Sequence, residues 1–104
     1  MEKSSVVEAV TVAFGLQVAP KQGAFGGCGR VYVCVSGDKA TINAVAAAAK
    51  KLGLIFQRKA HYGLGNALYI GYDNADGRAI ARGEAIAESL TKAGLPAYME
   101  ACGD

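Results

Sequence analysis

Hydrophobic residues occupy almost every even position near the start of the chain. The odd positions between them are mostly small or polar. A repeat of two is typical of a β-strand with one buried face, so we predict an N-terminal strand that ends before Pro20. Ser5 and Glu8 also have the spacing of a helix capping box, which leaves a helix as the alternative. The apolar even positions are Val6, Val10, Val12, Phe14, Leu16 and Val18.

A second strand and a helix follow a glycine-rich segment. Apolar and more polar side chains alternate along residues 31–36, which predicts a strand. The next segment places its apolar residues on one helical face. Asp38 is a suitable N-cap and Gly53 a suitable C-cap, so we predict a helix between them.

The rest of the chain contains two further strands, a helix and a last strand. Residues 54–62 and 66–73 flank the sequence Gly-Leu-Gly-Asn, which permits the positive φ angles of a hairpin turn. An apolar stripe predicts a helix over 78–94, and residues 97–102 alternate as a strand. Gly83 lies within the stripe, where alanine is the better helix former. We therefore expect this helix to cross close over the sheet.

The order of elements from Arg30 onward is strand, helix, strand, strand, helix, strand. This is the split βαβ order of a ferredoxin-like α+β domain. In that topology the four strands are antiparallel, in the order last, first, third, second, and both helices cover one face. We predict one domain over 1–104, with an N-terminal strand and glycine-rich connector in 1–29 and a βαββαβ core in 30–104. The first core strand already has two neighbours, so the N-terminal strand must pair at a sheet edge or with a second copy.

Composition and charge narrow the range of partners. The chain has 104 residues, of which 52% are hydrophobic and 19% charged, as in a folded globular domain. Eleven basic and nine acidic side chains are scattered along it, with a formal net charge of +2, so we expect neither nucleic acid nor a membrane as a partner. No segment has the roughly 20 apolar residues that span a bilayer. An odd number of cysteines suggests free thiols and a cytoplasmic location.

The segment Gly-Ala-Phe-Gly-Gly-Cys-Gly-Arg over residues 23–30 could bind phosphate or serve as a connector. Phosphate-binding loops present backbone N–H groups at a helix N-terminus, usually with a lysine. Here the glycines precede a strand, and no Gly-Lys-Ser/Thr ending is present. We therefore predict a connector whose glycines permit unusual backbone angles.

Three cysteines and one histidine have the right number of ligands for a zinc site, but no Cys-x-x-Cys pair is present. The predicted topology brings Cys102 near Cys28, whereas Cys34 lies closer to Tyr98. We therefore predict no metal and no cofactor. A redox pair of Cys28 and Cys102 remains an alternative.

The sheet face without helices is the best candidate for a binding surface. If the valines at 31, 33 and 35 point towards the helices, then Tyr32, Cys34 and the residues of matching parity on the other strands point away. Tyrosine offers apolar area with a polar tip, which suits both ligand pockets and subunit interfaces. Gly71 and Gln57 share the predicted parity, and the candidate ligand-binding residues on this face are Tyr32, Cys34, Lys59, His61, Tyr69, Tyr98 and Glu100.

Two functions follow as hypotheses. The first is a homo-oligomeric module, a dimer or larger, that binds a small molecule or a partner on the tyrosine-rich face. The second is a small enzyme with an active site between subunits, in which His61 or Glu100 acts as the acid or base. No known nucleophile motif accompanies these residues, so we favour a protein that is not an enzyme.

Overall fold

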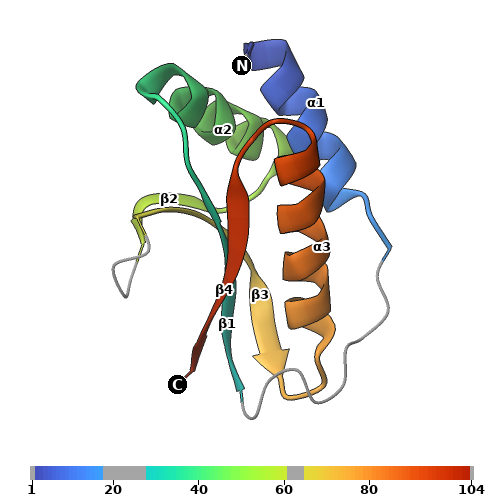
Figure 1. Ribbon diagram of the computed structural model, residues 1–104. Helices are drawn as coiled ribbons and strands as arrows, with labels where there is room; N and C mark the ends of the chain where they lie inside the picture. Colours follow the sequence, from blue (N-terminus) through green and yellow to red (C-terminus); the bar gives the residue numbers. More distant parts are fainter. Residues whose placement is uncertain (1, 18–27, 61–64, 104) are drawn as a thin grey trace.

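The computed structural model describes residues 2–17, 28–60 and 65–103, and its elements form an α+β domain (Figure 1). The glycine-rich segment up to residue 27, His61 and the start of the hairpin turn lie outside the described residues. In chain order the elements are α1 (Lys3–Phe14), β1 (Cys28–Val35), α2 (Lys39–Leu52), β2 (Phe56–Ala60), β3 (Gly65–Asn74), α3 (Arg78–Lys92) and β4 (Ala97–Gly103).

The four strands form one antiparallel sheet in the order β2-β3-β1-β4. β1 is central, and Tyr32 lies opposite Tyr69 of β3 and Glu100 of β4. β2 and β4 are the edges. The prediction of an α+β fold with an antiparallel sheet is confirmed.

The predicted N-terminal strand is wrong, because residues 3–14 form the helix α1. The segment contains a helical stripe as well as an alternation: Val6, Ala9, Val10 and Ala13 follow the i, i+3, i+4, i+7 spacing, and all four are buried. Val12, which shares the parity of Val10, is 56% exposed. The capping-box alternative also differs from the structure, in which Glu2 is the N-cap.

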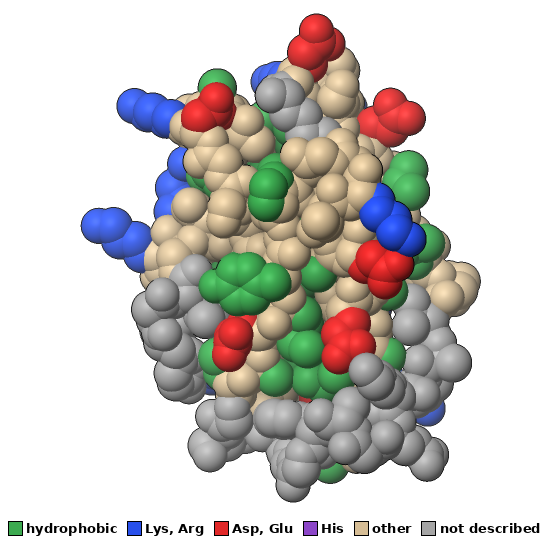
Figure 2. Space-filling model, in the orientation of Figure 1, with side chains coloured by type: hydrophobic (Ala, Val, Ile, Leu, Met, Phe, Trp, Pro, Cys, Tyr) green, Lys and Arg blue, Asp and Glu red, His purple; other side chains and the backbone are tan. Residues whose placement is uncertain are grey.

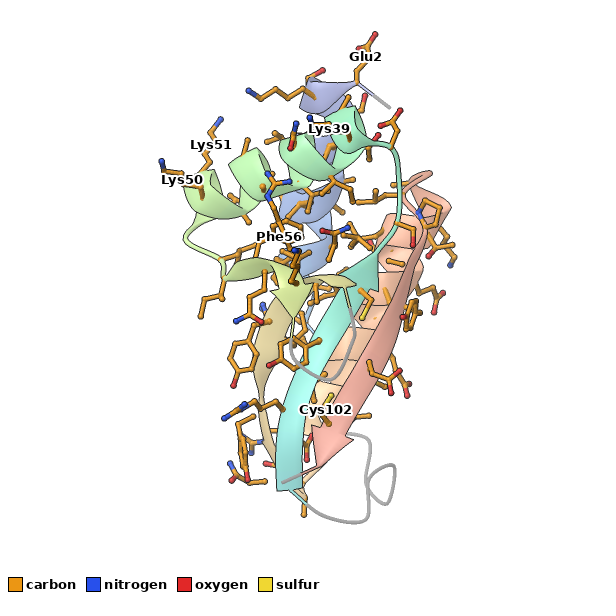
Figure 3. All side chains as sticks on the ribbon, turned by 90° about the vertical axis from the view of Figure 1, so that its left-hand side faces the viewer. Glu2, Lys39, Lys50, Lys51, Phe56 and Cys102 are labelled. Carbon is orange, nitrogen blue, oxygen red and sulfur yellow. The ribbon has the colours of Figure 1, made fainter. Side chains whose placement is uncertain are left out.

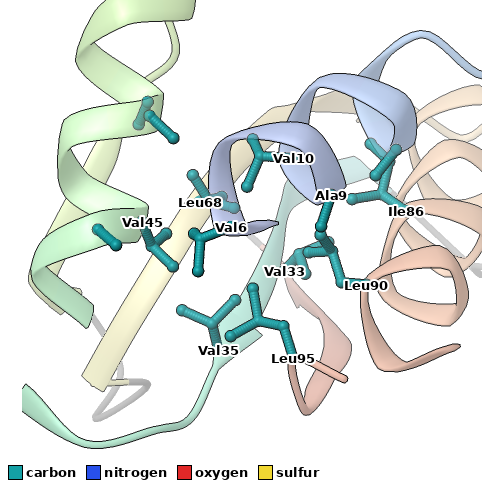
Figure 4. Packing of buried hydrophobic residues seen from close by; sticks show 14 of the residues in the cluster. Val6, Ala9, Val10, Val33, Val35, Val45, Leu68, Ile86, Leu90 and Leu95 are labelled. Carbon is teal, nitrogen blue, oxygen red and sulfur yellow. The ribbon is translucent and has the colours of Figure 1, made fainter. Parts of the chain in front are cut away.

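α1 lies between the two other helices and completes the core. It packs against both α2 and α3. Figure 4 shows its buried side chains between Val45 of α2 and Leu90 of α3, and Val33 and Leu68 of the sheet belong to the same cluster. At its C-terminal end, Arg82 donates a hydrogen bond from Nη2 to the Phe14 carbonyl oxygen at 3.3 Å, and its guanidinium lies over the Phe14 ring. A third helix, which packs on α2 and α3, therefore joins the expected pair.

The ends of α2 and α3 are fixed by local hydrogen bonds. Asp38 accepts one from the Thr41 N–H at 2.8 Å, and Gly53 has the left-handed conformation of a C-cap, as predicted. At the other helix, the buried carboxylate of Asp73 accepts hydrogen bonds from the N–H groups of Gly77 and Ile80. Asp73 thereby joins the end of β3 to the first turn of α3.

Gly83 marks the closest approach of α3 to the sheet, as predicted. It is buried, and a Cβ atom built on it would lie 2.8 Å from Cγ of Met99 and 2.9 Å from Cγ1 of Val31. Both distances are shorter than van der Waals contact, so the helix needs glycine to lie this close to β1 and β4.

Among the described residues, no helix has the length and apolar character needed to cross a bilayer.

Candidate functional site

The sheet surface opposite the core is built from three rows of side chains, and we refer to it as the helix-free face. The strand register places Tyr32, Cys34 and Arg30 of β1 each between one residue of β3 and one of β4. Figure 3 looks onto this face, with Cys102 near its lower end. The rows are Ala67–Cys34–Tyr98, Tyr69–Tyr32–Glu100 and Tyr72–Arg30–Cys102, and Gln57 extends the first row onto β2.

A β-bulge changes which β3 residues reach this face. The register of β1 and β3 shifts between Val31 and Tyr32. As a result Gly71 lies opposite Val31, whose side chain is in the core. The prediction that Gly71 belongs to the helix-free face is therefore wrong. Tyr72 takes its place opposite Arg30. The bulge adds one residue to β3 and so reverses the parity beyond it.

The centre of the helix-free face is buried within the chain, whereas its rim is accessible. Tyr32 and Cys34 are each 2% exposed and pack with Ala67, Tyr69 and Cys102 as a second apolar cluster. The Tyr32 and Tyr69 rings meet edge to face, with centroids 5.5 Å apart. The expectation of a bare face is therefore wrong at the centre. A partner would instead meet the rim, where Tyr98 is 53% and Tyr72 41% exposed.

The thiol of Cys34 is a poor nucleophile in this environment. Burial raises its pKa, and the nearby Glu100 and Cys102 act in the same direction. The Tyr98 hydroxyl donates a side-chain hydrogen bond to the sulfur, which opposes that rise and raises the pKa of the Tyr98 phenol. Both groups are therefore neutral at pH 7.

The second described thiol is also in its neutral form. Burial and Glu100 raise the pKa of Cys102, and Arg30 only partly opposes them. Cys34 and Cys102 are both free and lie two rows apart, about 13 Å along the strands, which is too far for a disulfide. The side chain of Cys28 lies outside the described residues, so the Cys28–Cys102 pair stays a prediction. Within the described ranges, no group of three or more His, Cys, Asp or Glu residues could hold a metal ion.

The proposed acid and base are not brought together by the described part of the chain. Glu100 is half-buried beside Tyr32, but His61 lies outside the described residues. Lys59 is exposed on β2, where the register is irregular, and no β3 residue lies opposite it. Gln57 does reach the helix-free face, and its buried Oε1 atom has no hydrogen-bond partner among the residues that the structure describes. The enzyme hypothesis therefore stays a prediction.

A groove between α1 and α3 was not anticipated from the sequence. Its larger part has a volume of about 400 Å³, and a neighbouring hollow of about 330 Å³ shares two of its lining residues, Ser89 and Lys92. Lys92 forms an exposed ion pair with Glu88 at 2.8 Å on the same helix. Recognising α1 as a helix was the step needed to predict this groove, because its wall includes Ala9 and Val12.

No model of a known protein family, no curated protein and no solved structure matches this chain. Its function is therefore argued from the surfaces described above.

Proposed function

We propose that this chain is a self-associating binding module, not an enzyme, and that its helix-free face is the contact surface between two copies. The observation that supports this proposal is the ring of accessible tyrosines around a centre that is already packed within the single chain. Tyr69, Tyr72 and Tyr98 lie on this face, and the last two are the most exposed. Tyrosine is enriched at protein interfaces because its ring buries apolar area while its hydroxyl finds a polar partner.

The few charges on this face favour pairing with a copy of itself. Arg30 and Glu100 lie in adjacent rows on neighbouring strands, one of each sign. In a two-fold symmetric interface, a contact between one residue of the first copy and another residue of the second copy occurs twice, with the copies exchanged. Two such faces can therefore place Arg30 of each copy against Glu100 of the other. A small-molecule ligand, if the module takes one, would be held between the tyrosines of the two rims.

We place the βαββαβ unit in the ferredoxin-like class with α1 as an added helix. This assignment is supported by the order of elements and by the position of β1 and β3 at the centre of the sheet. α1 packs against both α2 and α3 on the core side of the sheet, so the exposed rim of the opposite face stays accessible. Fold alone does not determine function, so the proposal rests on the face and not on the class.

Sedimentation velocity tests self-association directly. We expect a dimer at tens of micromolar, roughly the range in which a standard interface holds. Glu100→Arg should shift the protein to monomer, because it places like charges across the interface. The double variant with Arg30→Glu and Glu100→Arg should restore the dimer. Asn43→Ala, an exposed change on α2, is the control and should leave the dimer intact.

Two results would contradict the proposal. One is a wild-type monomer throughout this concentration range. The other is a dimer that Glu100→Arg leaves unchanged, because the contact would then lie on another surface.

A further inference from the structure

Five of the eleven basic residues of this chain lie in a stretch that contains no acidic residue. Residues 39–72 contain five Lys and Arg residues and no Asp or Glu, whereas the rest of the chain has six basic against nine acidic side chains. Figure 2 shows Lys and Arg side chains projecting from the left-hand side, where α2 and β2 lie. The five residues are Lys39, Lys50, Lys51, Arg58 and Lys59.

Four of these cations lie on the two elements joined by the α2–β2 connection, in the last turn of α2 and on β2, and we refer to them as the basic edge: Lys50, Lys51, Arg58 and Lys59. Lys50 and Arg58 border a hollow of about 260 Å³ between α2 and β2, whose lining includes Phe56. Lys50 and Lys51 occupy the last turn of α2, above Phe56 in Figure 3. All four cations are exposed, and none forms an ion pair within the described part of the chain.

Aliphatic side chains are exposed in the middle of the basic edge. Leu52, the last residue of α2, is 37% exposed, and Ile55, which precedes β2, is 55% exposed. In sequence the two lie between the Lys50–Lys51 and Arg58–Lys59 pairs. Water solvates an exposed isoleucine poorly, and no other element covers this one. The edge therefore combines two exposed aliphatic side chains with cations on the two elements that they connect.

We infer that the basic edge docks onto a membrane surface that contains anionic lipids. This inference goes beyond the proposed self-association and uses other residues. Lys and Arg next to a bilayer are attracted by the negative potential of anionic headgroups. Aliphatic side chains among them can enter the boundary between headgroups and acyl chains, while the long cationic side chains remain at the headgroup level. The exposed Leu52 and Ile55, next in sequence to four exposed cations, supply both kinds of contact.

Nucleic acid also attracts cations but fits the edge less well. Single-stranded nucleic acid is usually held by exposed aromatic rings that stack on bases. Phe56 is half-buried and packs against the main core cluster, so its ring is held by the protein. Leu52 and Ile55 would gain nothing against phosphates. A bilayer accounts for both the charged and the apolar residues.

Vesicle co-sedimentation tests the inference with phosphatidylcholine vesicles prepared with and without phosphatidylserine. We expect the protein to bind only the vesicles that contain phosphatidylserine, and added salt to weaken binding. Lys50→Ala with Lys51→Ala should lower the partition constant by roughly tenfold or more, since each cation contributes about a fivefold factor. Ile55→Ser should lower it as well, at unchanged net charge.

A matched control separates local contact from net charge. Lys3→Ala with Arg78→Ala removes two exposed cations from α1 and α3 and should change binding little. Equal losses in the two double variants would overturn the inference, as would equal binding to both kinds of vesicle. Tight binding to an RNA oligonucleotide without binding to vesicles would overturn it in favour of nucleic acid. Circular dichroism of each variant checks that it is folded.

Discussion

At the residue scale, Asp73 shows how one buried charge can be stabilising. Burial alone raises the pKa of its carboxyl, but the backbone N–H groups of Ile80, Gly77, Ala75 and Ala79 outweigh burial and hold the pKa below the ordinary value of 3.8. The charge therefore occupies a site built to hold it. Loss of the carboxylate would leave donors at the start of α3 without a full acceptor.

Asp73→Asn should lower the free energy of unfolding by roughly 1–2 kcal/mol at pH 7. The pKa of Asp73 is lower in the folded state than in the unfolded state. Its carboxylate therefore stabilises the fold at pH values above the unfolded-state pKa of about 3.9, and this stabilisation is lost as the pH falls through the folded-state pKa. Urea denaturation at several pH values should therefore show that the difference in unfolding free energy between wild type and variant decreases below about pH 4. Asp76→Asn removes a neighbouring exposed charge and serves as the control. A gap that stays constant down to pH 3 would show that the charge of Asp73 contributes nothing.

At the element scale, the structure of α1 can be tested by two valines two residues apart. In a strand Val10 and Val12 would point to the same face, whereas in the helix Val10 is buried and Val12 is 56% exposed. Val10→Ala should cost about 2 kcal/mol of unfolding free energy, as for removal of buried methyl groups. Val12→Ala should change it by less than about 0.5 kcal/mol. Thermal or urea denaturation measures both, and equal losses would support a strand.

The error at α1 shows the limit of periodicity as evidence. β-Branched valines at even positions are typical of a strand, but four of the apolar residues also follow helical spacing. The choice between the two depends on tertiary packing, here the space between α2 and α3 that α1 fills. The other elements were predictable because their signals agree: Asp38 and Gly53 delimit α2, and alternation within β1 separates core from surface.

The sequence predicts which face of the sheet the candidate site residues occupy, but not how exposed their side chains are. Alternation along β1 and β4 placed Tyr32, Cys34 and Tyr98 on one face, as observed. It could not show that Tyr32 and Cys34 would be covered, because alternation identifies the face and not what packs on it. The bulge that brings Tyr72 to this face lies beside Gly71, and an isolated glycine within a strand pattern is a sign of a bulge that the simple alternation does not take into account. The basic edge was visible in the sequence, in the absence of acidic residues from 39 to 72.

At the scale of the whole molecule, the buried centre and the exposed rim of the helix-free face should respond differently to mutation. Tyr32 is 2% exposed and contributes to the stability of the single chain, whereas Tyr98 is 53% exposed and contributes little to it. If two copies associate through the rim, association stabilises the folded state and the melting temperature rises with protein concentration. This dependence distinguishes the role of the two tyrosines.

Tyr98→Ala should therefore abolish the concentration dependence while leaving the melting temperature of the dilute protein almost unchanged. Tyr32→Ala should lower the melting temperature at every concentration, because it removes a ring from a packed cluster at a cost of roughly 3 kcal/mol or more. Differential scanning fluorimetry over a hundredfold range of protein concentration can separate the two patterns. Binding of a partner at about 100 times its dissociation constant stabilises the folded state by about 2.7 kcal/mol. If Tyr98→Ala melts like wild type and both rise with concentration, the copies associate through a surface other than this rim. Tyr98→Ala could instead lower the melting temperature of the dilute protein as much as Tyr32→Ala does. In that case the hydrogen bond from Tyr98 to Cys34 stabilises the single chain, and Tyr98 contributes to folding and not to contact with a partner.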